Sequence, residues 1–285
     1  MRALVLSGGA INGAYQVGAL KYLINNLNIK YDILCGVSVG ALNCAFLSLY
    51  SKNQEQEGIA NLEKIWKSIN NSKIRKHWLP FGPVHGLWEN SIYDSQPLID
   101  LVNQTFDINQ CRKSGRIVSV SAVNVNTGEY KSFTQEDSNF TQAILASSAY
   151  PMGLKPIEIN KEKWTDGGVK HIIPLKEAID LGATDIDLIA CSPKNNTKQY
   201  EHSDVINFGL RCFDLMTDQN IDADLKMAEL YNRLVSAGLE KNKKYLNIKV
   251  IRPYTHLDSS PLDFDPVVIT NLINQGYQSA QDQYL

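Results

Sequence analysis

Residues 31–50, YDILCGVSVGALNCAFLSLY, contain a short apolar run, a serine between two glycines and a second apolar run. The first run predicts a buried β-strand over 33–37. The second predicts a helix over 39–50 that is apolar almost all round, as is typical of a helix buried against a sheet. This stretch therefore predicts a strand, a tight turn and a buried helix.

The turn itself is the pentapeptide Gly36-Val37-Ser38-Val39-Gly40, which matches the pattern G-x-S-x-G. A strand that ends in this pattern and continues as a helix is typical of a nucleophile elbow, in which the serine Oγ is held outward and Gly36 and Gly40 permit the crowded backbone. Ser38 is therefore a candidate nucleophile. The alternative is a serine that only caps the helix.

One strand earlier, a glycine-rich turn covers residues 7–13, Ser-Gly-Gly-Ala-Ile-Asn-Gly, between a predicted strand at 2–6 and a predicted helix at 14–26. Backbone amides at such a turn can stabilise the negative oxygen that forms during acyl transfer. The spacing is not the G-x-G-x-x-G of a dinucleotide site, and no Gly-Lys-[Ser/Thr] of a phosphate loop is present.

The order strand, turn, helix, strand, turn, helix predicts a parallel sheet with helices on its faces. The remaining predicted strands are 116–125, 130–134, 163–165, 187–191 and 246–251; the predicted helices are 55–70, 97–106, 141–147, 175–181, 204–217, 220–239 and 266–283. We expect 73–88 to be irregular and 194–203 to be a loop. With no repeat or linker in the sequence, a single domain over 1–285 is favoured.

The composition is that of an ordinary globular protein, with 44% hydrophobic residues, a net charge of −2 and five scattered cysteines. The charge does not favour nucleic acid as a partner, and no apolar run is long enough to span a bilayer. The N-terminus predicts a buried strand rather than a signal peptide. We expect reduced thiols and a cytoplasmic location, although export without a signal peptide stays compatible with the sequence.

A third element is Asp166-Gly167-Gly168, which follows a short predicted strand. It is either a simple Asp-Gly turn or a carboxylate placed to reach Ser38. A serine hydrolase commonly uses a histidine base, but the five histidines (His77, His85, His171, His202, His256) do not lie in an informative motif. In an α/β-hydrolase several strands precede the elbow, so an elbow at residue 38 argues against that fold.

Together these blocks resemble the patatin-like phospholipase family. The similar segments are the glycine-rich block at 8–13 with its continuation at 14–18, the elbow at 36–43, Ala-Ser-Ser-Ala-Tyr-Pro at 146–151 and the D-G-G block at 166–168. The resemblance is dense over residues 1–190 and thin afterwards. Two residues depart from the family pattern, because Ala10 replaces a glycine and Asn12 replaces a basic residue.

The resemblance implies an α/β three-layer sandwich with a mostly parallel central sheet and helices on both faces. It implies a Ser38–Asp166 dyad without histidine, an oxyanion hole from Gly8, Gly9 and Ala10, and no metal or cofactor. The implied substrate is a phospholipid, a lysophospholipid or another acyl ester. The departures at Ala10 and Asn12 leave open a weak or inactive member that binds lipid or protein. The oligomeric state is left open.

The segment 73–81, together with Trp88, mixes cations with aromatic and apolar residues. Such a segment is compatible with a membrane interface near the active site, or with a loop whose aromatic rings pack inward. Residues 218–229 imitate a calcium loop, but the sixth position is Ala223 where a glycine is needed, so a helix is the expected structure.

Overall fold

The computed structural model describes residues 1–79, 89–194, 205–240, 244–257, 260 and 262–284. The expected roles or structures of Phe81, His85, Trp88, His202 and the polar stretch 195–203 lie outside these residues.

Five parallel strands form the centre of the main sheet, in the order β10 (Asn247–Ile251), β9 (Asp185–Ile189), β1 (Arg2–Leu6), β2 (Ile33–Gly36) and β5 (Ile117–Asn124). Three antiparallel strands continue from β5: β6 (Tyr130–Thr134), β8 (Glu162–Asp166) and β7 (Ile157–Ile159). The predicted mostly parallel sheet is confirmed.

Alternate residues of β1 pack on opposite faces of the sheet, because side chains along a strand alternate in direction. Leu4 and Leu6 belong to the larger hydrophobic core, whereas Ala3 and Val5 belong to a smaller core on the other face. The larger core contains residues of α1 (Gly13–Asn25), α2 (Val39–Leu47), α3 (Glu55–Ser68), α6 (Gln96–Thr105), α8 (Phe140–Ser147) and α11 (Pro266–Gln283). The smaller core contains residues of α9 (Leu175–Asp180) and α10 (Val205–Ser236).

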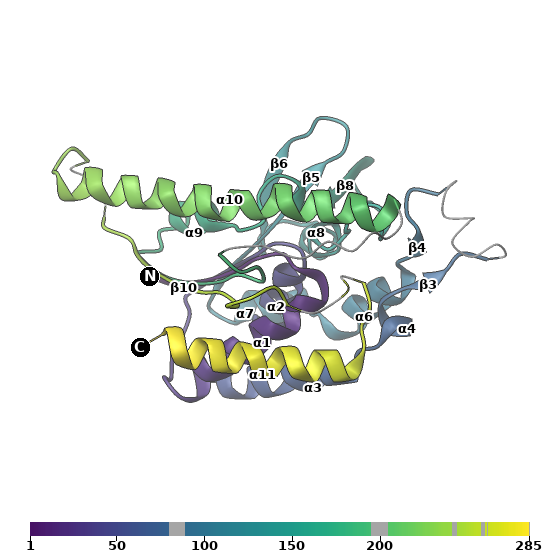
Figure 1. The fold of residues 1–285 in the computed structure, drawn as a ribbon, viewed down its shortest axis with the longest axis horizontal. Coiled ribbons are helices and arrows are strands. Elements are labelled where there is room, and N and C mark those ends of the chain that lie inside the picture. Colours follow the sequence, from purple (N-terminus) through teal and green to yellow (C-terminus); the bar gives the residue numbers. More distant parts are fainter. Residues whose placement is uncertain (80–88, 195–204, 241–243, 258–259, 261, 285) are drawn as a thin grey trace.

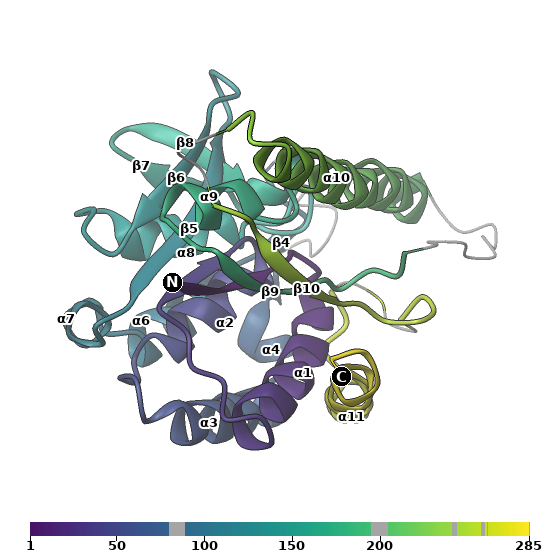
Figure 2. The ribbon, with the colours of Figure 1, turned by 90° about the vertical axis from the view of Figure 1, so that its left-hand side faces the viewer.

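Figures 1 and 2 show the same three layers, with α10 on one side of the sheet and α1, α3 and α11 on the other. The helices therefore cover both faces, as expected for a three-layer sandwich.

Strand β5 brings two strand ends together. Its first half pairs with β2, its second half pairs with β8, and β6 pairs across both halves. Because β6 occupies one edge of β5, β2 and β8 must share the other edge. They run toward each other along it, so Gly36 at the end of β2 lies opposite Val120, and Asp166 at the end of β8 lies opposite Ala122.

A buried ion pair braces the other end of this region. The guanidinium of Arg116, just before β5, donates to Glu55 Oε1 at 2.8 Å and to the carbonyl oxygens of Tyr31, Leu47 and Tyr50. Its side chain is fully buried. These bonds tie together the start of β2, the end of α2 and the start of α3.

Three sequence-based predictions are wrong in detail. The two helices predicted at 204–217 and 220–239 are one continuous helix, α10, because the polar run between them contains neither proline nor glycine to break it. The segment expected to be irregular begins inside helix α4 (Asn71–Ile74) and contains a short strand, β3 (Lys76–His77), paired with β4 (Tyr93–Asp94). Helix α7 (Ile108–Lys113) and strand β7 were not predicted.

All five cysteines are free thiols. Within the described ranges, every helix is either too short or too polar to cross a bilayer.

Candidate active site

Ser38 lies at the turn between β2 and α2 with φ 57° and ψ −128°, the mirror image of an ordinary extended conformation. A side chain there is strained, as expected of a nucleophile elbow. The turn fits only because the flanking residues lack a Cβ: a Cβ on Gly36 would lie 2.3 Å from the carbonyl oxygen of Gly40, and a Cβ on Gly40 would lie 2.4 Å from that of Leu6. The backbone therefore has the geometry that the pentapeptide predicts.

A second serine, Ser147 of helix α8, fixes the position of the elbow by a hydrogen bond. The amide of Ser38 donates to Ser147 Oγ at 3.0 Å, and Ser147 is fully buried in the last turn of α8. This bond connects the elbow to the segment 146–151. The sequence singled out that segment as a block but gave Ser147 no role.

Asp166 is the last residue of β8 and is 2% exposed. Its Oδ1 accepts a hydrogen bond from the amide of Gly168 at 2.8 Å, whereas Oδ2 is buried without a hydrogen-bond partner among the described residues. Burial raises the pKa of Asp166 to about 7, against the opposing effects of the Ser38 hydroxyl and the Gly168 amide. A carboxyl group with this pKa can exchange a proton near neutral pH.

The structure brings Ser38 and Asp166 together, as the shared edge of β5 requires. The Ser38 hydroxyl is close enough to favour the ionised carboxylate of Asp166. The two side chains do not form a complete hydrogen bond, because Asp166 Oδ2 has no hydrogen-bond partner in the described part of the chain. Catalytic hydrogen bonds are often loose before substrate binds.

The glycine-rich loop packs against the elbow. A Cβ on Gly8 would lie 3.1 Å from the Cβ of Ser38, so the backbone of Gly8 lies against the Ser38 side chain. The amide of Gly8 donates to the carbonyl of Ile172 at 3.0 Å and is already engaged. Within the described residues, no hydrogen bond is made by the amides of Gly9 and Ala10. Ala10 has φ 50°, a left-handed conformation suited to glycine, so the backbone shape survives the substitution.

A chain of hydrogen bonds between buried side chains supports the glycine-rich loop. Gln16 Nε2 donates to the carbonyl of Ser7 at 2.7 Å, and Asn43 Nδ2 donates to Gln16 Oε1 at 2.9 Å. Trp66 Nε1 completes the chain by donating to Asn43 Oδ1 at 2.8 Å. The first helical turns of α1 and α2 are thereby locked to the loop, which limits its freedom to collapse.

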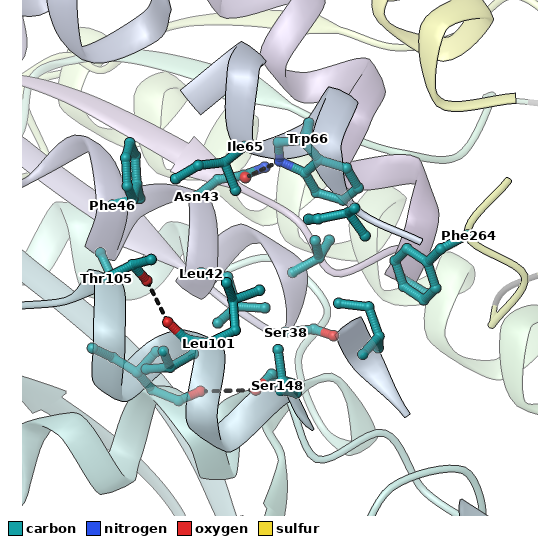
Figure 3. Close-up of a pocket in the computed structure, with 18 of the residues that line it drawn as sticks. Ser38, Leu42, Asn43, Phe46, Ile65, Trp66, Leu101, Thr105, Ser148 and Phe264 are labelled. Atoms are coloured by element: carbon teal, nitrogen blue, oxygen red, sulfur yellow. Dashed lines mark hydrogen bonds between the residues drawn. The ribbon is translucent and has the colours of Figure 1, made fainter. Parts of the chain in front are cut away.

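An apolar pocket begins at Ser38 and Ala10 and follows one face of α2. Along that face lie Val39, Leu42, Asn43 and Phe46, at the helical spacing i, i+3, i+4 and i+7. Helices α3 and α6 form the two sides. Figure 3 shows Ser38, Ser148 and Phe264 on one side of the pocket and Phe46 and Thr105 on the other. From Val39 to Phe46 the helix rises about 10 Å. The sequence predicted a buried helix here but no pocket.

The described histidines have other partners. His77 packs on Tyr93 and His171 on Tyr130, while His256 Nδ1 lies 2.8 Å from the carbonyl of Leu257. None of these partners is Ser38 or Asp166.

A protein-family model described as patatin-like phospholipase matches residues 4–179, more than half of the 285-residue chain. The probable lipid hydrolase 463L of Invertebrate iridescent virus 6 is 26% identical over 192 residues, which cover 62% of this chain and 63% of the relative. The calcium-independent phospholipase A2-gamma of Mus musculus is 23% identical over 59% of this chain and 24% of its own length. The chain thus covers less than two thirds of these relatives.

The crystal structure of VipD from Legionella pneumophila is similar in fold, with a TM-score of 0.53 and 15% identity. The match covers 99% of this chain and 66% of that one. The matched family model includes the glycine-rich loop, the elbow and the Asp166 turn. The chain therefore belongs to the patatin-like phospholipase family.

Proposed function

We propose that the chain is a lipid acyl hydrolase that uses Ser38 as the nucleophile and Asp166 as the base. The observation that supports this best is a strained serine beside a buried carboxyl group with a pKa of about 7, at the head of an apolar pocket. The names of the relatives, a probable lipid hydrolase and a phospholipase, agree with a lipid ester as the substrate.

In the acylation step, Ser38 Oγ attacks the ester carbonyl and its proton passes to Asp166 Oδ2, the carboxylate oxygen that is free to accept it. The tetrahedral intermediate then breaks its bond to the alcohol, which leaves with the proton from Asp166. Water resolves the acyl-enzyme by the same route. The proton returns to Ser38 when the fatty acid is released.

The negative oxygen of the intermediate would be bound by the amides of Gly9 and Ala10. Loss of one such donor typically costs about 3 kcal/mol of transition-state stabilisation. Gly8 can add a third donor only if its amide leaves the carbonyl of Ile172. The left-handed backbone of Ala10 supports an active site over an inactive binding module, because it keeps the loop open despite the missing glycine.

The α2 pocket fits an alkyl chain. Its lining is mainly aliphatic and aromatic, and an extended alkyl chain advances about 1.3 Å per carbon for C–C bonds near 1.5 Å. The 10 Å of α2 then correspond to about eight carbons. The predicted substrate class is an ester of a medium or long fatty acid.

A direct test of the dyad is the hydrolysis of short, soluble p-nitrophenyl esters. Ser38→Ala and Asp166→Asn should each lower kcat/KM about 1000-fold or more, because one removes the nucleophile and the other the base. Ser132→Ala, on strand β6, is the matched control and should retain wild-type activity. If both dyad variants keep most of the activity, the assignment is wrong.

The pocket is tested by Leu42→Phe, which fills its middle without touching the dyad. Hydrolysis of long-chain esters should fall about tenfold relative to butyryl esters, since a lost fit of one or two methylenes changes the free energy by about 1–3 kcal/mol. The ratio of kcat/KM for the two esters is the measurement. An unchanged ratio would place the acyl chain elsewhere.

A further inference from the structure

Two segments form a rim beside the dyad. The first is the run from Lys73 to Leu79, and the second is the turn from Tyr150 to Lys155 that follows α8. They are joined through residues 91–93: Trp78 Nε1 donates to the carbonyl of Ser91 at 3.0 Å, and the amide of Ile92 donates to the carbonyl of Met152 at 2.7 Å. The rim is therefore one connected structure.

The inner side of this rim belongs to the pocket. Ile74, Tyr150 and Leu154 are buried and line it, and their neighbours Arg75, Met152 and Lys155 lie on its outer side. The amide of Asp166 donates to the carbonyl of Ala149, just before Tyr150. A substrate that reaches Ser38 past Tyr150 and Leu154 must first pass this outer side.

The outer side exposes large apolar side chains. Leu79 is 86% exposed and Met152 is 44% exposed. Gly209 near the start of α10 lies next to this point, since a Cβ there would be 3.8 Å from Met152 Cε, and its chain neighbour Phe208 is 53% exposed. Met152 also has φ 63°, a left-handed backbone that is uncommon for a residue with a Cβ. Exposed apolar groups gathered at one site commonly mark an interaction surface.

The two segments of the rim carry four cations, Lys73, Arg75, Lys76 and Lys155. Arg75 lies 3.9 Å from the ring centre of Tyr93, and Lys155 lies 5.8 Å from that of Trp78. Asp94 pairs with Lys76 at 3.1 Å, and Asp263 lies at the edge through its bond to Asn71. Glu89, two residues before Ser91, is a third acidic residue of this region, so the four cations exceed the carboxylates by one although the whole chain has a net charge of −2.

We propose that this rim docks on the surface of an anionic lipid bilayer. Cations attract the lipid head groups, and the exposed apolar and aromatic side chains enter the boundary between head groups and acyl chains. The choice of a bilayer over a protein partner rests on the proposed function, because Ile74, Tyr150 and Leu154 on the inner side of the rim line the pocket proposed to hold the acyl chain. The charge excess selects an anionic surface over a neutral one.

The experiment is vesicle sedimentation of the full chain, with phosphatidylcholine alone and with about one third phosphatidylglycerol. Wild type should bind the anionic vesicles more tightly. Charge reversal of Lys73, Lys76 and Lys155 to glutamate should lower that binding at least tenfold, since each cation near an anionic surface adds about a factor of five. Leu79→Ser should weaken binding to both kinds of vesicle.

The matched control reverses three other exposed lysines, Lys113, Lys226 and Lys244, and so changes the net charge equally. It should retain most of the binding. Hydrolysis of soluble butyryl esters should stay at the wild-type rate in the rim variant, which separates docking from catalysis.

Equal loss in the rim and control variants would mean that only overall charge matters, and it would overturn the proposal. So would wild-type binding by the rim variant, or a wild-type chain that stays in solution with both vesicles, which would point to another partner. Sedimentation measures binding without turnover. If the wild-type protein binds the vesicles through the rim but hydrolyses no ester, the proposed hydrolysis is wrong and the docking proposal stands.

Discussion

A buried ionisable side chain lies near each end of helix α2, and the two differ in whether their hydrogen bonds are made. At the carboxyl end, Arg116 pairs with Glu55 and donates to carbonyl groups at the end of the helix, including that of Leu47. At the amino end, Asp166 Oδ2 is left without a hydrogen-bond partner among the described residues, next to Ser38 with its strained backbone. The hydrogen bonds of Arg116 are therefore made, whereas one carboxylate oxygen of Asp166 has none.

The difference shows which buried group contributes to stability and which is suited to catalysis. A buried charge with all its hydrogen bonds made stabilises one arrangement of the chain, since breaking the pair leaves an isolated charge. A buried carboxyl group that lacks a partner has a raised pKa and is ready to take a proton. The strain at Ser38 is tolerated because the surrounding strands, glycines and Ser147 fix the turn.

The largest expected effect is at the satisfied end. Arg116→Met should lower the free energy of unfolding by about 3–5 kcal/mol, because Glu55 would remain buried without its cation. Urea denaturation at neutral pH measures this loss. The double variant Arg116→Met/Glu55→Leu should recover much of it. A single variant as stable as wild type would show that the pair is unimportant.

The next effect is at the unsatisfied end and has the opposite sign. Asp166→Asn should gain stability over wild type as pH rises, by about 2–3 kcal/mol between pH 5 and pH 8 for a pKa raised from 3.8 to about 7. Urea unfolding at the two pH values measures it. A difference that does not change with pH would contradict the raised pKa.

The sign follows from proton binding. Between about pH 4 and pH 7 the folded protein keeps the proton on Asp166 while the unfolded chain has released it. The stabilisation from this group is complete below the unfolded pKa and is lost as pH rises through the folded one. Asparagine has no proton to lose, so the variant escapes this loss.

A smaller effect is expected from the backbone of the elbow. Ser38→Gly should be more stable than Ser38→Ala by about 1 kcal/mol, because glycine adopts positive φ freely while alanine keeps the strain. Both variants lack the hydroxyl, so thermal unfolding of the pair isolates the backbone term. Equal stability would mean that the turn is not strained.

Much of the active-site region follows from local patterns in the sequence. Strand β1 has the predicted bounds, and β2 and α2 begin where the run around Ser38 predicts. Asp166 ends its strand as the D-G-G block suggests. These features depend on neighbouring residues: alternating or continuous apolar runs, and glycines that a tight turn needs.

Other features depend on contacts between distant residues, which a single sequence does not show. The occupied amide of Gly8 requires the carbonyl of Ile172, and the buried pair joins Arg116 to Glu55. The α2 pocket requires side chains from five helices, α2, α3, α4, α6 and α8. The two helices predicted in place of α10 are wrong, because Asp218 and Gln219 between them do not break a helix. The single domain and the cytoplasmic location stay predictions.

The central claim is that Asp166 activates Ser38, and the pH dependence of Ser38 acylation tests it most directly. The rate of labelling by a fluorophosphonate should rise through pH 7 in wild type and level off above it, because the carboxylate form of Asp166 is the base. In Asp166→Asn the labelling rate should fall at least about 100-fold and should show no inflection near pH 7. Labelling of the variant at the wild-type rate, or with the same inflection, would contradict the account.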